Sequence, residues 1–160
     1  MSVRLVWLVI LLYSDVGVAQ QLHVVINGKA YHFDNKRDWN EKNYGLGFEY
    51  DFAPRGNWIP LLTGSSFKDS NSHTSRYLGA GIKRRFLFGK DPKGLHLDVG
   101  VVGFAMTRRD YNNNDPFLGA LPFVSLGNEF VAINATYIPK VHPKFVSLLY
   151  FQLMIRLAEF

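Results

Sequence analysis

Residues 145–157 read FVSLLYFQLMIRL, and this stretch decides the fold class of the chain. From position 151 onward apolar side chains hold the odd positions, whereas Gln152, Met154 and Arg156 hold the even ones. Neighbouring side chains of a β-strand point to opposite faces, so this alternation predicts one apolar face and one more polar face. A strand of a membrane barrel has these two faces, because lipid contacts one and the barrel interior contains the other.

Segments with the same period of two recur along the chain. They cover residues 21–33, 44–52, 58–67, 76–86, 95–106, 117–126, 130–138 and 145–157. Turn-forming Gly, Pro and Asn residues separate several of them, as at 54–57, 89–94 and 127–129. The sequence therefore predicts an all-β protein, an eight-stranded antiparallel up-and-down transmembrane β-barrel. The alternative is a soluble lipocalin-like barrel or sandwich, in which the polar faces would point outward.

The first 19 residues have the pattern of a secretory signal peptide. A basic start at Arg4 precedes an apolar run over 5–13, which is too short to span a bilayer. Gly17-Val18-Ala19 then supplies small residues before the expected cleavage site. We expect a signal peptide over 1–19, export to the bacterial outer membrane, and one barrel domain over 20–160.

Composition limits the cofactors and partners. The chain has no cysteine and a formal net charge of +5. Its cations are spread in small groups rather than gathered in one basic arm, which favours an anionic lipid surface over nucleic acid. The sequence shows neither a His/Asp cluster with metal-ligand spacing nor a Gly-rich phosphate loop at a helix start. We expect no metal, no cofactor and no nucleic-acid partner, and we expect a monomer.

Chain topology brings reactive groups to one end of the predicted barrel. If both ends of the barrel domain face the periplasm, the connections 34–43, 68–75, 107–116 and 139–144 lie at the outer rim. That rim collects imidazole, carboxylate, hydroxyl and guanidinium groups, which suggests a reaction site: His32, Asp69, Ser70, Arg108, Asp110 and Tyr111. The rim cations could bind the phosphates of outer-leaflet glycolipid: Lys36, Arg37, Lys42, Lys68, Arg76, Arg108, Arg109, Lys140 and Lys144.

From about Ala30 to the end, the chain resembles the lipid A palmitoyltransferases, the PagP barrels of the outer membrane. The order and spacing of several short motifs carry this resemblance. They are Trp39-Asn40-Glu41, Gly45-Leu46-Gly47-Phe48, Gly56-Asn57-Trp58, Phe67-Lys68-Asp69-Ser70, Gly79-Ala80-Gly81, His96-Leu97 with Gly100, Thr107-Arg108-Arg109-Asp110, Leu121-Pro122-Phe123-Val124-Ser125-Leu126-Gly127 and Thr136-Tyr137-Ile138-Pro139.

The resemblance implies an acyltransferase that moves a palmitoyl or similar chain from a phospholipid to lipid A. A histidine on the first strand and an Asp-Ser pair at the outer end of the third are required for acyl transfer in that family. Carried over, these catalytic residues are His32, Asp69 and Ser70. A family glycine on the fourth strand marks the depth that sets acyl-chain length, and the matching position is Gly81.

Further positions follow from the resemblance and from the rim. The prolines of the family open lateral gates to lipid, and the matching residues are Pro122 and Pro139. Arg108, Asp110 and Tyr111 are the expected substrate-binding residues at the rim. The chain departs from the family pattern in two places. Its loop after the first strand is shorter, and no space for the amphipathic helix of the family precedes that strand.

The chemistry can also be argued from the residues alone. Acyl transfer needs a proton acceptor and a group that stabilises an oxyanion. His32 could be the base, with His23 near the other end of the strand as the alternative. Asp69 could orient the histidine, and Ser70 could be nucleophile or oxyanion donor. The alternative functions are a non-catalytic structural or lipid-binding outer-membrane barrel of the same fold, and a lipid A deacylase.

Overall fold

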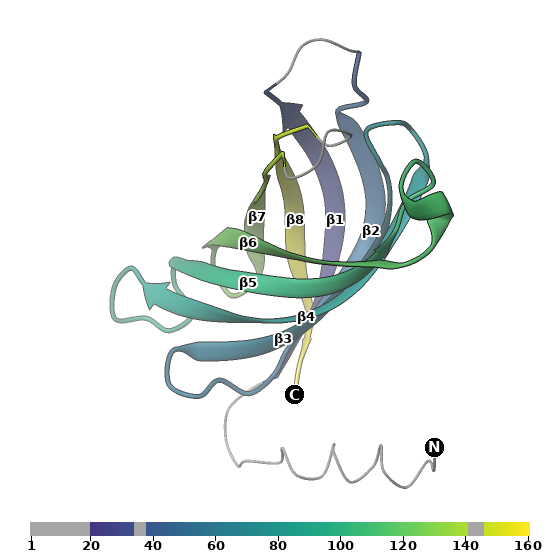
Figure 1. The fold of residues 1–160 in the computed structure, drawn as a ribbon. Helices are drawn as coiled ribbons and strands as arrows, with labels where there is room; N and C mark the ends of the chain where they lie inside the picture. The colour runs from purple at the N-terminus through teal and green to yellow at the C-terminus, as the bar shows by residue number, and fades with distance from the viewer. Residues whose placement is uncertain (1–19, 34–37, 141–145) are drawn as a thin grey trace, which may run out of the picture.

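The computed structural model describes residues 20–33, 38–140 and 146–160, which form one closed antiparallel β-barrel (Figure 1). The strands are β1 (Gln21–His32), β2 (Lys42–Asp51), β3 (Trp58–Lys68), β4 (Thr74–Leu87), β5 (His96–Thr107), β6 (Phe117–Gly127), β7 (Val131–Ile138) and β8 (Leu148–Glu159). A short 3-10 turn, η1 (Asn112–Asn114), lies between β5 and β6. The expected signal peptide and the rim cations Lys36, Arg37 and Lys144 lie outside the described residues.

The barrel closes because β1 pairs with both β2 and β8. Gln20 and Phe160 extend this closing ladder by exchanging two backbone hydrogen bonds of 3.0 and 2.9 Å. The start of β1 and the end of β8 therefore lie at one end of the barrel, and we call the opposite end the rim. All eight predicted strands are confirmed, and the largest difference in their bounds is at β8, which begins at Leu148. Among the described residues, no helix is long and apolar enough to cross a membrane.

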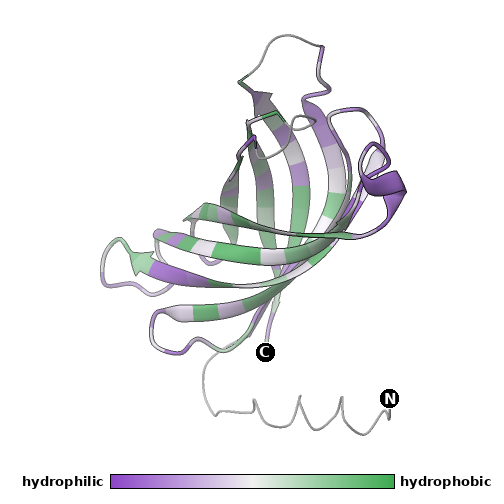
Figure 2. Cartoon of the chain, in the orientation of Figure 1, coloured by the Kyte–Doolittle hydropathy of each residue, from purple (hydrophilic) through white to green (hydrophobic). Residues whose placement is uncertain are grey.

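The outer wall of the barrel is apolar. Large hydrophobic side chains stay exposed on it, among them Leu46, Leu78, Leu118, Ile133 and Leu157. Figure 2 shows hydrophobic residues recurring along the strands, whereas the loop between β5 and β6 is hydrophilic. A soluble barrel would have the opposite arrangement, so the soluble alternative is wrong and the transmembrane barrel is confirmed.

Hydrogen-bonded polar side chains cross the middle of the bore. Asn27 of β1 is fully buried, and its side-chain Nδ2 donates to Ser65 Oγ of β3. Its Oδ1 accepts hydrogen bonds from Tyr150 Oη at 2.7 Å and from Gln152 Nε2 at 2.8 Å, both on β8. The network joins β1, β3 and β8 through the interior, where buried polar groups need such partners.

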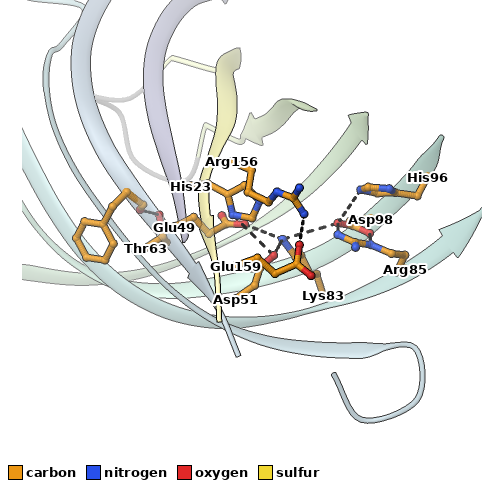
Figure 3. Close-up of polar contacts among 11 residues, drawn as sticks. His23, Glu49, Asp51, Thr63, Lys83, Arg85, His96, Asp98, Arg156 and Glu159 are labelled. Atoms are coloured by element: carbon orange, nitrogen blue, oxygen red, sulfur yellow. Dashed lines mark hydrogen bonds and ion pairs between the residues drawn. The ribbon is translucent and has the colours of Figure 1, made fainter. Parts of the chain in front are cut away.

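Towards the termini, charged and titratable side chains block the bore. This charged plug consists of His23, Glu49, Asp51, Lys83, Arg85, His96 and Asp98 (Figure 3). Lys83 Nζ lies 2.7 Å from Glu49 Oε1 and 2.8 Å from Asp51 Oδ2. A cavity of about 10 Å³ remains beside Lys83, so the plug leaves space for about one water molecule.

Candidate active site at the rim

A histidine and a serine from different strands meet at the rim. His32 is the last residue of β1, and Ser70 follows the end of β3 at Lys68. His32 Nε2 lies 2.8 Å from Ser70 Oγ, although the two residues are 38 positions apart in the chain. With the ring proton on Nδ1, Nε2 accepts a hydrogen bond from the serine hydroxyl. The structure thus brings together two of the three predicted catalytic side chains.

The segment before β2 holds this pair in place. The Trp39 ring stacks on the His32 ring with centroids 5.3 Å apart and an interplanar angle of 12°. Asn40 donates its backbone N–H to Ser70 O at 3.0 Å and its side-chain Nδ2 to Asp69 O at 3.1 Å. Asn43 Nδ2 donates to Lys68 O at 2.7 Å. The sequence analysis did not predict a role for these three positioning residues, although Trp39 and Asn40 belong to the motif Trp39-Asn40-Glu41 that the chain shares with the family.

Asp69 binds its own turn. Its Oδ1 accepts backbone N–H groups from Asn71 at 2.9 Å and from His73 at 3.0 Å. Its Oδ2 accepts a hydrogen bond of 2.8 Å from Ser75 Oγ. Within the described part of the chain, the carboxylate is thus bonded to residues 71–75 and not to His32. Asp69 is buried and shapes the turn that presents Ser70.

The loop between β5 and β6 closes the other side of the site. Arg108 and Asp110 form an ion pair at 3.1 Å, and Asn71 Nδ2 donates to Asp110 Oδ2 at 2.7 Å. Partial burial alone would raise the pKa of Asp110, but the hydrogen bonds from Arg108 and Asn71 outweigh it and hold that pKa below the usual aspartate range. Tyr111 packs edge-on against Phe117, with ring centroids 4.7 Å apart. The predicted rim residues are therefore neighbours of the turn that carries Ser70.

A cavity of about 270 Å³, the outer cavity, begins at these residues. Asp69, Ser70, Arg108 and Tyr111 line it on the rim side. Deeper in the bore lies an inner cavity of about 110 Å³. Both cavities share a largely apolar wall of Phe67, Phe104, Met106, Leu121, Ile138 and Tyr150. The bore above the plug is thus a mostly apolar space with a polar mouth.

The floor of the inner cavity is polar. Glu49, Asn134 and Gln152 line this cavity, and Glu49 belongs to the charged plug below it. Gly81 is on the inward register of β4 and pairs with Val102, which also lines the inner cavity. Gly81 therefore lies at the depth of the inner cavity, and its part in setting acyl-chain length stays a prediction.

His23, the alternative base, is far from the rim in the strand register. It is buried in the charged plug, with its Nδ1 4.0 Å from Asp51 Oδ2. It lies near the start of β1, at the end of the barrel that holds the termini, whereas His32 ends that strand. His23 therefore has no part in the rim site, and His32 is the histidine that Ser70 contacts.

The barrel wall is incomplete beside the outer cavity. The β6–β7 ladder runs from Gly127–Ala132 to Phe123–Thr136, and the rim half of β6 has no paired residue on β7. Pro122 directly precedes Phe123, the residue of β6 nearest the rim that pairs with β7, and Pro139 directly follows β7. Neither proline has an N–H to extend the ladder. The outer cavity is lined by both strands in this unpaired region, including Leu118, Ala120 and Pro139.

The geometry fits proton transfer at the mouth of an apolar bore. An imidazole nitrogen within hydrogen-bond reach of a hydroxyl can act as a general base. Trp39 holds the ring by stacking, which is a different arrangement from a Ser-His-Asp triad, where a carboxylate orients the histidine.

Comparison with known proteins identifies the family. The family described as "Antimicrobial peptide resistance and lipid A acylation protein PagP" matches residues 15–152. A lipid A acyltransferase PagP of Methylobacillus flagellatus is 34% identical over 113 residues, which cover 69% of this chain and 58% of the relative. A lipid A acyltransferase PagP of Legionella pneumophila is 35% identical over 115 residues, covering 71% and 59%.

The chain thus spans less than two thirds of the length of these relatives. Among solved structures, the Yersinia pestis outer membrane protein Ail in a phospholipid bilayer nanodisc has the same general fold. Its TM-score is 0.52 at 7% identity, and the match covers 88% of this chain and 100% of Ail. The fold similarity is independent of the sequence match. On the family match and the two relatives, this chain belongs to the PagP family of lipid A acylation proteins.

Proposed function

We propose that this protein is an acyltransferase of the bacterial outer membrane. It moves a palmitoyl or similar chain from a phospholipid to lipid A, and it works as a monomer. Family membership supports the reaction class, and the apolar outer wall supports the location. The observation that carries the proposal is the 2.8 Å contact between His32 and Ser70 at the mouth of the outer cavity.

The donor lipid enters from the side. Its acyl chain passes between β6 and β7, where the ladder ends at Phe123 and Thr136. The chain then occupies the outer and inner cavities, whose shared wall is largely apolar and excludes water. The ester carbonyl stays at the mouth beside Ser70. This route needs no opening of the paired part of the barrel.

His32 acts as the general base. It removes the proton from the hydroxyl that attacks the ester carbonyl, which is either Ser70 itself or the acceptor hydroxyl of lipid A. The ester C–O bond of the donor then breaks, and the lysophospholipid leaves after its oxygen takes the proton back from His32. If Ser70 attacks first, the acceptor hydroxyl attacks the Ser70 ester in a second round that frees the serine. When Ser70 is not the nucleophile, its hydroxyl donates to the developing oxyanion. Asp69 keeps the turn in shape, and Arg108 and Tyr111 contact the substrate at the mouth.

The polar floor limits acyl-chain length. A terminal methyl group gains from burial only while it contacts apolar side chains, at about 0.8 kcal/mol per buried CH₂. Glu49, Asn134 and Gln152 end that gain at the bottom of the inner cavity. Gly81 has no side chain and so leaves space for the end of the acyl chain at this depth. This is the substrate-binding role that the resemblance implies for it.

Mass spectrometry of lipid A tests the proposal. Lipid A from cells expressing the wild type should gain the mass of one acyl chain, and His32→Ala and Ser70→Ala should lose that gain. Removal of a general base lowers the rate by roughly 10²–10⁴-fold, which is enough to abolish the product peak. Ser66→Ala is the matched control. Ser66 is an exposed serine of β3, the strand that precedes the turn with Ser70, and its side chain faces away from the bore.

The other outcomes separate the alternatives. A loss of one acyl chain from lipid A would identify a deacylase. An unchanged lipid A mass, with the wild type folded in the outer membrane, would contradict acyl transfer and favour a structural or lipid-binding barrel. Gain of the acyl chain in all three variants would mean that His32 and Ser70 are not the catalytic pair.

A further inference from the structure

A further pocket, separate from the two cavities of the bore, lies on the rim beside the catalytic pair. This rim pocket has a volume of about 670 Å³, within the range of sites for small molecules. The end of β3, the start of β4 and the turn between them contribute Lys68, Ser72, His73 and Thr74 to its lining, and the β5–β6 loop contributes Arg109, Asn113 and Asn114. Every one of these side chains can donate a hydrogen bond. The β5–β6 loop is hydrophilic along this stretch (Figure 2).

Among the residues that the structure describes, no carboxylate pairs with the cations of the rim pocket, Lys68 and Arg109. No acid lines the pocket, and in the described ranges neither Lys68 nor Arg109 forms an ion pair. Lys68 Nζ donates to the neutral Thr74 Oγ1 at 3.1 Å. The neighbouring acids are already bonded elsewhere, Asp69 within its own turn and Asp110 to Arg108 and Asn71. Two cations and several neutral donors without an acid form a site for an anion.

The backbone holds these donors in position. Asp69 and His73 are joined by two bonds, from His73 N to Asp69 Oδ1 at 3.0 Å and from Asp69 N to His73 O at 2.8 Å. His73 Nδ1 is buried and has no hydrogen-bond partner among the described residues. Asn113 and Asn114 have φ values of 53° and 68°, a left-handed conformation that asparagine adopts more easily than most residues. The turn after β3 and the β5–β6 loop thus place a polar ring atom and two amides beside the cations.

The two loops that form the rim pocket also separate it from the outer cavity. Ser70 and Arg108 line the outer cavity, and their chain neighbours His73 and Arg109 line the rim pocket. The Asn71–Asp110 hydrogen bond of 2.7 Å joins the two loops between these spaces. A headgroup in the rim pocket would therefore lie beside the catalytic pair and outside the acyl-chain bore.

We propose that the rim pocket binds a phosphate-bearing sugar headgroup of an outer-leaflet glycolipid, with Lys68, Arg109 and His73 contacting the phosphoryl oxygens. This inference rests on the proposed function, because it makes the pocket the headgroup site of the lipid A acceptor. A phosphoryl group offers several strong acceptor oxygens, which match a guanidinium, an ammonium and a ring N–H. Bound there, the headgroup holds the sugar hydroxyls of the acceptor at the mouth of the outer cavity.

Binding to purified protein in detergent micelles tests this site without any acyl transfer. The probes are inorganic phosphate, lipid A with its phosphates, and the same lipid A after dephosphorylation. Backbone NMR signals of His73 and Asn113 should shift with phosphorylated lipid A, and dephosphorylation should weaken its binding about tenfold or more. Lys68→Gln and Arg109→Gln should each weaken it about tenfold, the size of one charge-assisted hydrogen bond.

Matched variants distinguish the loss of a pocket cation from a loss of the folded barrel. Lys90→Gln removes an exposed cation from the turn between β4 and β5, at the opposite end of the barrel from the pocket, and the affinity of this variant should stay within about twofold of the wild type. Arg109→Lys keeps the charge and should retain most of the affinity that Arg109→Gln loses. Circular dichroism verifies the barrel in every variant.

Several results would overturn the site. Equal affinity for phosphorylated and dephosphorylated lipid A would do so, and so would unchanged binding in the Lys68→Gln/Arg109→Gln double variant. Binding of inorganic phosphate without any discrimination between the two lipids would show that the pocket takes free anions and not the acceptor. If binding depends on phosphate as described but no acyl chain is transferred, the proposed function fails and the headgroup site stands.

Discussion

Asp69 and Ser70 are adjacent in the chain, and their side chains have separate partners at the rim. Ser70 Oγ contacts His32, whereas the Asp69 carboxylate accepts three hydrogen bonds from residues 71–75. Three hydrogen bonds offset the cost of burying this carboxylate, and its removal leaves the three donors without an acceptor. Asp69 is therefore a positioning residue for the serine.

This role predicts a graded response to substitution. Asp69→Ala should lower the free energy of unfolding by about 1–3 kcal/mol, because buried donors lose their acceptor, and it should lower acyl transfer by displacing Ser70. Asp69→Asn keeps Oδ1 as an acceptor for the two backbone N–H groups and should retain more transfer than the alanine variant. Transfer rates and guanidinium unfolding in micelles measure both effects.

Ser75→Ala serves as the control for this prediction. It removes one of the three hydrogen bonds and should cost about 1 kcal/mol, with transfer largely retained. An asparagine variant that is folded like the wild type and as inactive as Asp69→Ala would contradict the positioning role. It would show that the negative charge itself is needed in the reaction.

At the scale of strands, β4 and β5 approach each other closely at Gly81. An ideal Cβ at this position would lie 2.3 Å from the carbonyl oxygen of Val101 and 2.9 Å from Val102 Cγ2. A side-chain end can rotate away, but the carbonyl moves only with the strand. Glycine at 81 is thus required by the ladder, whatever its part in acyl-chain length.

Gly81→Ala should therefore destabilise the barrel by about 1–3 kcal/mol, the usual cost of forcing a methyl group into a packed site. Gly103→Ala is the matched control on β5, since a Cβ there meets nothing closer than 3.9 Å. It should change stability by less than about 0.5 kcal/mol. Unfolding midpoints of the two variants in micelles give the comparison. If the two variants are equally stable and Gly81→Ala transfers a shorter acyl chain, the predicted role of Gly81 in the strand ladder is wrong. Gly81 would then only determine acyl-chain length.

Alternation predicted the strands well because each one has a lipid face and an interior face of different polarity. The same rule states that Asp69 and Ser70 point to opposite faces, and it does not fix where the strand ends. β3 ends at Lys68, and the turn after it frees both side chains from that constraint. The contact between His32 and Ser70 spans 38 positions, so strand spacing alone could not predict it. The family resemblance proposed both residues as catalytic, which stays a prediction. Trp39 and Asn40 were missed because they lie between β1 and β2, and alternation does not predict the contacts of a connecting segment.

At the scale of the whole molecule, the barrel has an apolar half and a charged half. The rim half holds the two cavities, and the termini half is blocked by the charged plug (Figure 3). Alternation predicts a polar interior, and it does not predict this concentration of charge. A signal for the plug is present in the sequence: charged residues of one sign stand two positions apart on a strand and so share its inner face, as with Glu49 and Asp51 or Lys83 and Arg85.

The plug also makes a prediction about stability, because Lys83 is a fully buried cation among three buried carboxylates. Its Nζ lies 2.7 Å from Glu49, 2.8 Å from Asp51 and 3.7 Å from Asp98. Lys83→Met removes the close cation of Glu49 and Asp51, while Asp98 keeps its ion pair with Arg85, and should cost about 3–5 kcal/mol. Guanidinium unfolding in micelles measures the loss. Lys29→Met is the matched control, since its pair with Glu41 is 3.5 Å long and largely exposed, and should cost under about 1 kcal/mol.

A second variant separates lost charge balance from lost packing. Lys83→Met combined with Glu49→Met removes one cation and one anion, replaces both with apolar side chains, and should recover part of the stability that the single variant loses. A double variant less stable than Lys83→Met alone would contradict the electrostatic account, because the remaining loss would come from packing around Glu49. The double variant also replaces the Glu49 carboxylate that lines the inner cavity. If the polar floor limits the acyl chain, this variant should accept a longer chain than the wild type, read as a higher lipid A mass gain.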